Sequence, residues 1–598
     1  MIKLPVFQLD GRNLYYTFVA GAHKILENQS ELNNINVFPV NDKDTGTNLA
    51  STIRSVIDNI RPNRSFKITA NNIADAALIG ARGNSGIIFA QFFYGLSREV
   101  SDKKIINIQD FADSLKKSIS YIYEAVANPE EGTILTVIKD WVDYIYSRKN
   151  SIPDFKEMLI NSFEILKKSL QDTKTKLKIL SNSNVVDAGA KGFVVFIEGI
   201  IELISTGNIR KLLAEKVQNI SLIHSENAVD ETINFRYCTE AIIKDIKIDK
   251  NSLKNILQTN GDSVVVAGSE KISRIHVHTN QPAELFYQLK DYGTITFQKV
   301  DDMIRQNEVV TNRKWKIALV TDSTCDLPAE ILDKYQIHRL PMNINFGDNH
   351  YLDKVTIQPE QFYDLLNSFP DFPKTSQINE RSFTNLYSHL ASHYDAIISV
   401  HLTSQFSGTY LSSQKAAERI KKEFGKPIIS IDSKNLSGAL GLIVLRVAQA
   451  IENGLSISEI EKLTEKWIKS TKIFVSVKTL KYMVKGGRVS ATKGFISNLL
   501  NINPIVSMDE NGKSFLFGKT FSQKSNMKKV ISNIKSLSEK RTITDYIVLH
   551  TQNQISADWY VKQMKLITSK EPVSVINISP VIGMNAGIGA ASVAIMLD

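Results

Sequence analysis

The chain has 598 residues, of which 43% are hydrophobic and 22% charged, so its composition excludes a disordered or fibrous protein and its length predicts three or four domains. Its two cysteines, Cys238 and Cys325, exclude a disulfide framework and fit a reducing cytosol, where each is core filling or a reactive group. Lysine and arginine (72) outnumber aspartate and glutamate (62), and the net charge of +10 suits anionic small molecules or a lipid surface, while no Lys/Arg run is dense enough to indicate nucleic acid.

Residues 1–207 are predicted to form an all-α domain. The first residues carry Asp10 and Arg12 in place of the apolar stretch of a signal peptide, so we expect no secretion signal. Further along, apolar residues recur with a spacing near 3.6, and alternating β-branched runs are few. The predicted helices cover 13–28, 48–60, 73–96, 108–127, 133–147, 155–170 and 188–203.

Strands enter the pattern after about residue 215. FRYCTEAIIKDIKI, DSVVVAGSE and SRIHVHTN alternate like strands and 283–292 has helical spacing, so residues 215–311 are predicted to form a small α+β domain. From 313 onward strands alternate with helices, which predicts an α/β domain with a largely parallel sheet. Its strands are predicted at 315–321, 395–401 and 428–431, and its helices near Leu327 and Pro328 and at 408–424 and 437–453.

The segment 578–597 is long enough to span a bilayer and nearly free of charge. Pro580, Asn585 and several glycines interrupt it, so we predict a glycine-rich loop followed by one buried helix rather than a membrane span. We therefore expect a cytoplasmic protein, with any membrane contact peripheral and at the inner face.

An acidic loop, NVFPVNDKDTGTN at 36–48, is the first candidate site. Asp42 and Asp44 lie two residues apart, and paired carboxylates suit Mg²⁺. Thr45, Thr47 and Asn48 follow at a helix start, where free N–H groups favour phosphate. A capped turn with solvated aspartates explains the same residues without a ligand.

A glycine cluster, GARGNSG at 80–86, is the second candidate site. Backbone N–H groups around Asn84 and Ser85 can surround a phosphate. The cluster is not a Walker A loop, because no Gly-Lys-Ser/Thr follows. A close crossing of two helices is the alternative.

Two histidines alternate on a predicted strand, IHVHT at 275–279, so His276 and His278 face one side. With the Cys238 thiolate they would make a three-ligand site with an open fourth position, an arrangement that suits Zn²⁺. The spacing does not bring Cys238 near them, and a buried cysteine with two polar-face histidines is the alternative.

Hydroxyl groups gather near strand ends of the last domain, in VTDSTCDLP (320–328), PKTSQ (373–377) and LTSQFSGTY (402–410). Open α/β sheets hold ligands at such ends. Ser407 either caps the helix that follows or binds a carboxylate. No Ser–His–Asp arrangement and no nucleophile elbow is evident, which favours binding over hydrolysis. Cys325 is predicted to be core filling beside this loop.

The acidic loop resembles the NVFPVPDGDTGTN signature of the fatty acid kinase family, whose N-terminal domain is similar to the nucleotide-binding subunit of dihydroxyacetone kinases. GARGNSG, PEEGTILTV (129–137) and VVDAGAKG (185–192) recur in the same order. The resemblance implies an α-helical barrel that binds ATP, with Asp42 and Asp44 on Mg²⁺. It also implies a nucleotide pocket lined by Thr45, Thr47, Asn48, Asn84, Ser85 and Gly86 and completed by Thr133, Asp187 and Gly189.

Two positions depart from that signature, since the family's Pro and Gly are Asn41 and Lys43 here. Losing glycine could exclude a needed positive φ, while Lys43 could instead contact phosphate. FRYCTE and HVHTN also resemble the family's middle domain, where the cysteine and both histidines form a metal site. This resemblance implies that Cys238, His276 and His278 bind zinc.

The region from about 315 to 598 resembles the DegV family of fatty-acid-binding proteins. Its landmarks appear in order: VTDSTCDLP, KTSQ, SQFSGTY, IDSKNLSG, MVKGGRVS, NINPIVSMDENGK and PVIGMNAGIGA. The resemblance implies a two-lobed α/β fold with an apolar tunnel for the acyl chain, in which Thr375, Ser376 and Ser407 hold the carboxylate and Arg488 lies close by. Asn585 stands where the family often has histidine, which leaves hydrogen bonding as its role.

We therefore expect three domains, at 1–207, 215–311 and 313–598, forming a fatty acid kinase fused to its own acyl carrier. It would transfer the ATP γ-phosphoryl group to a fatty acid carboxylate, giving acyl phosphate for phospholipid synthesis. The partners expected are a long-chain fatty acid, a second copy in a homodimer, a downstream acyltransferase and a transient anionic membrane surface, without nucleic acid. The alternatives are a nucleotide-sensing lipid-binding protein and a kinase for a small hydroxyl compound of the glycerone type.

Overall fold

The computed structural model describes residues 7–38, 43–206, 233–488 and 503–598. They form two compact units, the first built from residues up to 281 with 289–307, the second from 282–288 with residues from 308 onward. Within the described residues, no helix combines the length and apolar character that crossing a bilayer requires.

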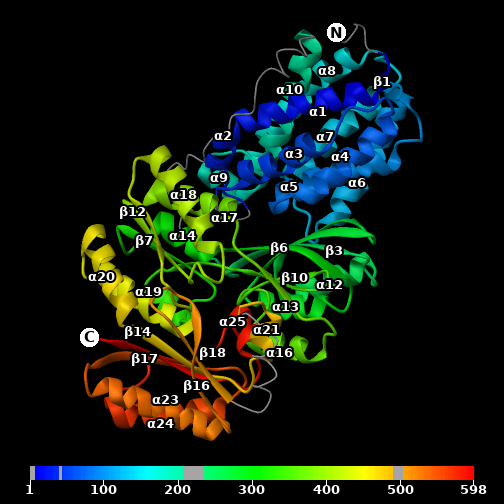
Figure 1. The fold of residues 1–598 in the computed structure, drawn as a ribbon. Coiled ribbons are helices and arrows are strands. Elements are labelled where there is room, and N and C mark those ends of the chain that lie inside the picture. The colour runs from blue at the N-terminus through cyan, green and yellow to red at the C-terminus, as the bar shows by residue number, and fades with distance from the viewer. Residues whose placement is uncertain (1–6, 39–42, 207–232, 489–502) are drawn as a thin grey trace. The chain divides into compact units, whose positions relative to one another are not determined.

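The first unit begins with a bundle of helices, which confirms the predicted all-α region (Figure 1). A core of edge-to-face aromatic rings, including Phe18, Phe89, Phe93 and Phe196, packs α1, α5 and α10 together. β1 (Leu9–Asp10) pairs antiparallel with β2 (Ile105–Ile106). The helices are α1 (Gly11–Glu27), α2 (Gln29–Asn34), α3 (Thr45–Asn59), α4 (Phe66–Gly80), α5 (Gly83–Glu99), α6 (Ile108–Ala125), α7 (Ile134–Arg148), α8 (Phe155–Lys176), α9 (Lys178–Ser183) and α10 (Ala188–Thr206).

One predicted helix, 73–96, is wrong as a single element, because α4 and α5 divide it. Ala81 and Arg82 leave the helical conformation between α4 and α5, and Gly83, the first residue of α5, has a φ of +58°. The helical spacing of apolar residues continues through this break, so periodicity alone does not reveal it.

An antiparallel four-stranded sheet completes the first unit, in the order β4-β5-β3-β6. Val265 and Ala267 of β4 belong to the same hydrophobic core as the helices. The three predicted strands are present, and a fourth, β6, completes the sheet. The elements are β3 (Tyr237–Lys244), α12 (Lys250–Asn260), β4 (Asp262–Ser269), β5 (Ile272–Thr279) and β6 (Thr294–Asp302). Between β5 and β6 the chain forms α13 (Pro282–Leu289), most of which belongs to the second unit.

The second unit continues, after α14 (Met303–Thr311), with a parallel sheet in the order β13-β12-β7-β8. The same stretch of sequence also forms a small antiparallel sheet, β10-β9-β11. The strands are β7 (Ile317–Asp322), β8 (His338–Leu340), β9 (Asn343–Phe346), β10 (Asn349–Leu352), β11 (Lys374–Ser376), β12 (Ala396–His401) and β13 (Ile428–Asp432). The helices are α15 (Ala329–Lys334), α16 (Pro359–Ser368), α17 (Glu380–His393), α18 (Thr409–Phe424) and α19 (Ser437–Glu452).

A second lobe holds a six-stranded sheet in the order β16-β15-β14-β19-β17-β18. In this sheet only β17 and β18 pair in parallel. The expected parallel sheet is therefore found in β13-β12-β7-β8 and not in this second lobe. The buried helix α19 packs against both sheets. The strands are β14 (Thr471–Ser476), β15 (Asn503–Met508), β16 (Ser514–Thr520), β17 (Ile543–His550), β18 (Ser574–Asn577) and β19 (Ala591–Leu597). The helices are α20 (Ile457–Ser470), α21 (Lys481–Lys485), α23 (Gln523–Ser538), α24 (Gln554–Thr568) and α25 (Pro580–Ala586).

The prediction for 578–597 is wrong in its order and type, since a short helix comes first and strand β19 follows. Every residue of β19 is buried between β14 and β17. A short apolar run buried on both faces has no periodicity that separates strand from helix, and pairing with distant strands decides the outcome.

Candidate functional site

The acidic loop leads into α3. Asp42 lies outside the described residues, whereas Asp44 immediately precedes α3 and does not cap it with its side chain. Thr45 donates its hydroxyl to Asn36 over 2.6 Å, and the Thr47 hydroxyl accepts hydrogen bonds from side chains of α2. Both threonines therefore fix the loop against its surroundings, and the Asp44 carboxylate is the described group that suits a cation.

The glycine cluster lies against the start of α3. A Cβ on Gly83 would lie 2.3 Å from Asn48 Nδ2, and one on Gly86 would lie 2.6 Å from Thr52 Oγ1. A larger residue at either position would therefore displace the side chain of Asn48 or Thr52. Asn84 Oδ1 is buried and has no hydrogen-bond partner among the described residues, so this acceptor needs a donor from elsewhere.

The two remaining motifs meet at the same place. A Cβ on Gly189 would lie 2.6 Å from Ser85 Oγ, and Thr133 caps α7 at its start. Burial raises the pKa of Asp187 to about 6, although hydrogen bonds from backbone N–H groups oppose this rise. The structure thus brings four separated motifs together in the first unit, as a site for a polyanion bound by backbone and small polar groups would need.

The sheet of the first unit gathers Cys238, His276 and His278, whose ligand atoms all lie within 4.8 Å of one another. Cys238 comes close through strand pairing, because β3 runs antiparallel to β5 with Cys238 opposite His278. Across β4, β5, β3 and β6 the register gives one row of Asp262, His278, Cys238 and Asp301 and a second of Val265, His276, Glu240 and Lys299.

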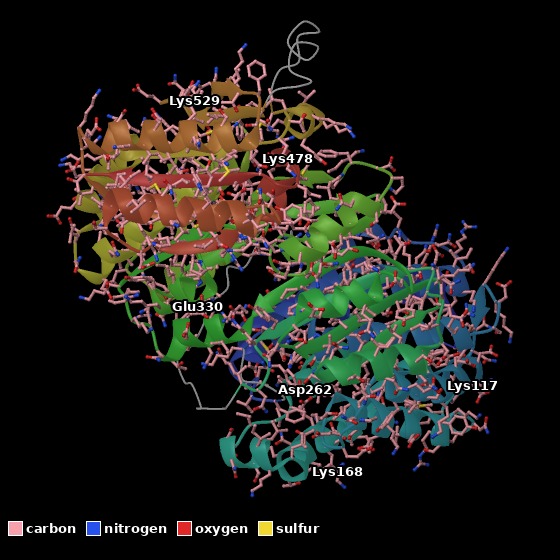
Figure 2. The ribbon with its side chains drawn as sticks, turned by 90° about the horizontal axis from the view of Figure 1, so that it is seen from below. Lys117, Lys168, Asp262, Glu330, Lys478 and Lys529 are labelled. Carbon is pink, nitrogen blue, oxygen red and sulfur yellow. The ribbon has the colours of Figure 1, made fainter. Side chains whose placement is uncertain are left out.

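Each histidine has a carboxylate behind it. His276 Nδ1 lies 3.6 Å from Glu240, and His278 Nδ1 lies 3.4 Å from Asp262, which is labelled in Figure 2 and about half exposed. His276 Nδ1 also faces the thiol, 3.9 Å from Cys238 Sγ, and the buried Nε2 of the same ring has no partner among the described residues. One thiolate and two oriented imidazoles fit Zn²⁺.

The cluster lies in the electrostatic field of the acidic loop. Burial, then the carboxylates of Glu240, Asp301 and, more weakly, Asp44 hold the pKa of the Cys238 thiol well above its usual range. Burial lowers the pKa of His276, opposed by Glu240 and Asp44. The Asp44 carboxylate of the acidic loop therefore acts electrostatically on the thiol and on the His276 imidazole.

Sequence reasoning missed Glu240, Arg274 and Asp262 at the thiol–imidazole cluster. Alternation along β3 places Glu240 on the same face as Cys238, and alternation along β5 does the same for Arg274 and His276. That signal was present in the sequence for Glu240 and Arg274. Asp262 depends on the pairing of β4 with β5, which the sequence does not specify.

In the second unit, the predicted carboxylate loops meet. A Cβ on Gly408 would lie 2.1 Å from Gln377 Oε1, and the Ile378 N–H donates to Thr409 Oγ1 over 3.4 Å. Thr375 and Ser376 lie on β11, and Ser407 accepts from the Thr409 N–H at the start of α18.

An apolar cavity of about 60 Å³ lies beside these loops. Arg488 and Asn585 line it, as does Phe406 next to Ser407, whereas Thr375 and Ser376, both described, do not. Asn585 Oδ1 is buried without a partner among the described residues. The apolar wall comes from Ile473, Val475, Val506, Met508, Ile578 and Ile582.

An Asp–His–Ser arrangement is present, contrary to the sequence prediction. His401 Nδ1 lies 3.1 Å from Asp322, and its Nε2 lies 2.6 Å from Ser399 Oγ. All three are fully buried, and Ser399 also accepts from the Tyr387 hydroxyl. Asp322 further accepts from the Leu402 N–H, so the arrangement anchors the loop before α18 and has no access to a substrate.

Comparison with known proteins matches each part of the chain to a family. Residues 39–202 match the DAK2 domain, and residues 234–310 match the FakA-like middle domain of fatty acid kinases. Residues 316–598 match the DegV family, which is described as uncharacterised.

Curated relatives and solved structures cover parts of the chain. An uncharacterised protein of Staphylococcus haemolyticus is 31% identical over 320 residues, 52% of this chain and 58% of that protein, so the chain spans little more than half of this relative. "DegV, a fatty acid binding protein from Bacillus subtilis" is 28% identical with a TM-score of 0.43, covering 48% of this chain and 100% of that one. A fatty-acid-binding DegV family protein of Thermus thermophilus is 24% identical with a TM-score of 0.44, and the match covers 47% of this chain and 100% of that one.

Proposed function

Because this chain joins a DAK2 domain and a fatty acid kinase middle domain to a DegV-family domain, we propose that it is a fatty acid kinase with its own acyl carrier. The observation that carries the proposal is that one chain combines the four clustered motifs of the first unit with an apolar cavity in the second unit. We call the clustered motifs the proposed kinase centre. We propose the functional boundaries 1–207, 215–311 and 313–598.

In the proposed reaction, a carboxylate oxygen of the fatty acid attacks the γ-phosphorus of ATP. The bond between that phosphorus and the oxygen bridging to the β-phosphate breaks, ADP leaves with the electron pair, and acyl phosphate forms. The carboxylate is ionised near neutral pH and needs no base, so catalysis comes mainly from positioning.

The first unit would hold the nucleotide. Asp42 and Asp44 would bind Mg²⁺, which neutralises charge on the phosphates. The start of α3 and of α5 would offer backbone N–H groups, and the orphaned Asn84 carbonyl would accept from the ligand. The pocket is completed by Thr45, Thr47, Asn48, Ser85, Gly86, Thr133, Asp187 and Gly189.

Zn²⁺ would occupy the cluster of Cys238, His276 and His278 and lock the orientation of both rings. In the second unit, Thr375, Ser376 and Ser407 would hold the fatty acid carboxylate, with Arg488 and Asn585 at the cavity wall.

The test incubates the purified chain with Mg-ATP and oleate and traps acyl phosphate with hydroxylamine. Hydroxamate should form with the natural chain and with Asp58→Ala, an exposed aspartate on α3, and fall at least a hundredfold with Asp44→Ala. Lipid bound without hydroxamate would favour the nucleotide-sensing alternative, which Asn41 and Lys43 support. Transfer to dihydroxyacetone would favour the small-hydroxyl alternative.

We also propose that acyl phosphate passes to an acyltransferase at an anionic membrane surface. Residues 511–538 carry six lysines and no acidic residue, with Lys529 projecting from α23 in Figure 2, and Phe521 is 90% exposed. Sedimentation with phosphatidylserine vesicles should be lost at high salt and should fall with Phe521→Ser. Light scattering tests the homodimer.

A further inference from the structure

One buried carboxylate joins the sheet to the helices of the first unit. Glu240 on β3 is 1% exposed, and its Oε1 accepts from the Gly83 N–H over 2.6 Å. Its Oε2 accepts from Arg274 Nη2 over 2.7 Å, and His276 Nδ1 lies 3.6 Å from Oε1. A single side chain therefore contacts the start of α5, a buried cation and one member of the thiol–imidazole cluster.

The hydrogen bond from the Gly83 N–H connects Glu240 directly to the glycine cluster at 80–86. Gly83 is the first residue of α5, has a positive φ and packs against Asn48 at the start of α3. Arg274 holds the other side of the same break, because its Nη1 donates to the carbonyl of Ile79 in α4 over 3.1 Å. The Glu240–Arg274 ion pair thus holds the end of α4 and the start of α5, which lie on the two sides of the break.

The contact with His276 reaches the cluster. His276 Nδ1 lies 3.6 Å from Glu240 Oε1 and 3.9 Å from Cys238 Sγ, so the same ring atom faces both the carboxylate and the thiol. A metal ion held by this cluster would therefore lie close to Glu240 and attract its carboxylate. Glu240 is enclosed and ion-paired, so a shift of its Oε1 toward the metal acts on Gly83, whose N–H donates to the same oxygen.

We propose that Glu240 is a positioning residue that couples metal binding at Cys238, His276 and His278 to nucleotide binding at the start of α5. This inference rests on the proposed function, since it takes the start of α5 as part of the nucleotide site. Coupling is reciprocal, so nucleotide also tightens metal binding by the same factor. Asp262 lies behind the other histidine but is half exposed and pairs with His278 rather than with Gly83, so it provides a matched control.

The experiment uses the full chain and measures the Kd of MgADP by calorimetry, with the zinc content set to one or zero per chain by reloading or by a zinc-selective chelator. In the natural chain zinc should tighten MgADP binding about tenfold, within the usual range of coupling. Glu240→Gln should bring this ratio to about one. Asp262→Asn should weaken zinc binding yet keep the tenfold ratio once zinc is bound.

A tenfold ratio that survives in Glu240→Gln would overturn the proposal, as would an equal loss of the ratio in Asp262→Asn or a ratio of one in the natural chain. If Glu240→Gln does not fold, Glu240→Asp keeps the charge beside Arg274 while withdrawing from Gly83, and should give a ratio near one. If the natural chain does not bind MgADP under any condition, the proposed function fails as well, whereas unchanged MgADP binding across all variants removes only the coupling.

Discussion

Lys43 occupies a backbone conformation that favours glycine. Its φ is 53°, at the position where the resembling signature has glycine, and its side chain is 8% exposed. The loop thus keeps its geometry although the residue type changed, at a cost of about 1–2 kcal/mol for a side chain in the left-handed region. The substitution does not by itself argue for an inactive site.

Two variants separate the conformation of Lys43 from its charge. Lys43→Gly should raise the free energy of unfolding of the first unit by up to about 1 kcal/mol, measured as a small rise in its unfolding midpoint. Lys43→Asn keeps a residue that tolerates this φ but removes the charge. If the ammonium group contacts phosphate, both variants should weaken MgADP binding about tenfold, and unchanged binding in both would exclude that role.

Asp187 gives the ligand-free protein a pH-dependent stability. Burial raises the pKa of Asp187 to about 6 from an ordinary 3.8. The folded state therefore binds more protons than the unfolded state between these values, so the free energy of unfolding falls as pH rises through 6, by up to about 3 kcal/mol.

Asp187→Asn should remove this dependence, because the amide stays neutral and keeps an acceptor. Urea unfolding at pH 4.5 and 7.5 measures it: relative to the natural chain, the variant should gain stability at pH 7.5 and little at pH 4.5. Asp172→Asn, an exposed position on α8, should show no such gain. A similar gain in both variants would contradict the assignment to Asp187.

At the scale of elements, the break between α4 and α5 places the glycine cluster at 80–86 against the start of α3, which follows the acidic loop. Gly83→Ala adds a Cβ only 2.3 Å from Asn48 Nδ2, whereas Gly425 at the end of α18 also has a positive φ (67° against 58°) and a Cβ there would meet no atom within 4 Å. Gly425→Ala should cost about 1 kcal/mol and leave MgADP binding unchanged. Gly83→Ala should cost more and weaken MgADP binding at least tenfold, and equal binding in both variants would contradict a role for this contact.

Local patterns in the sequence predicted most helices and the strands that carry the candidate ligands. The failures occurred where distant pairing decides the structure: β19 is a strand because β14 and β17 enclose it, and Cys238 meets His278 only through the register of β3 with β5. The break at Gly83 was missed because the apolar period continues across it. The buried Asp322–His401 contact was missed because it joins the ends of two parallel strands.

At the scale of the whole molecule, one chain carries both the proposed kinase centre and the proposed carrier. Linkage gives the carrier an effective concentration at the kinase of about the millimolar range if the connection allows them to meet. Covalent linkage would then replace the docking of a separate carrier protein on the kinase.

Mixing two inactive chains tests this arrangement. Asp44→Ala removes the proposed cation ligand, and Ser407→Ala weakens carboxylate binding, so each chain alone should form little hydroxamate. For transfer within one chain, the equimolar mixture should remain below about a tenth of natural activity. Recovery to near half would contradict transfer restricted to one chain, and the natural chain diluted tenfold provides the reference for concentration dependence.

The place of β19 has a consequence for synthesis. This strand follows all others of its sheet in the sequence but lies in the middle of it, between β14 and β17. Until β19 has left the ribosome, the strands of this lobe can form only two separate pieces of sheet, β16-β15-β14 and β17-β18. Each piece has an edge with unpaired backbone groups where β19 will pair. The first unit, which emerges earlier, has its own core and does not wait for that strand. The proposed kinase centre is therefore complete before the proposed carrier, so in a nascent chain nucleotide binding would precede lipid binding.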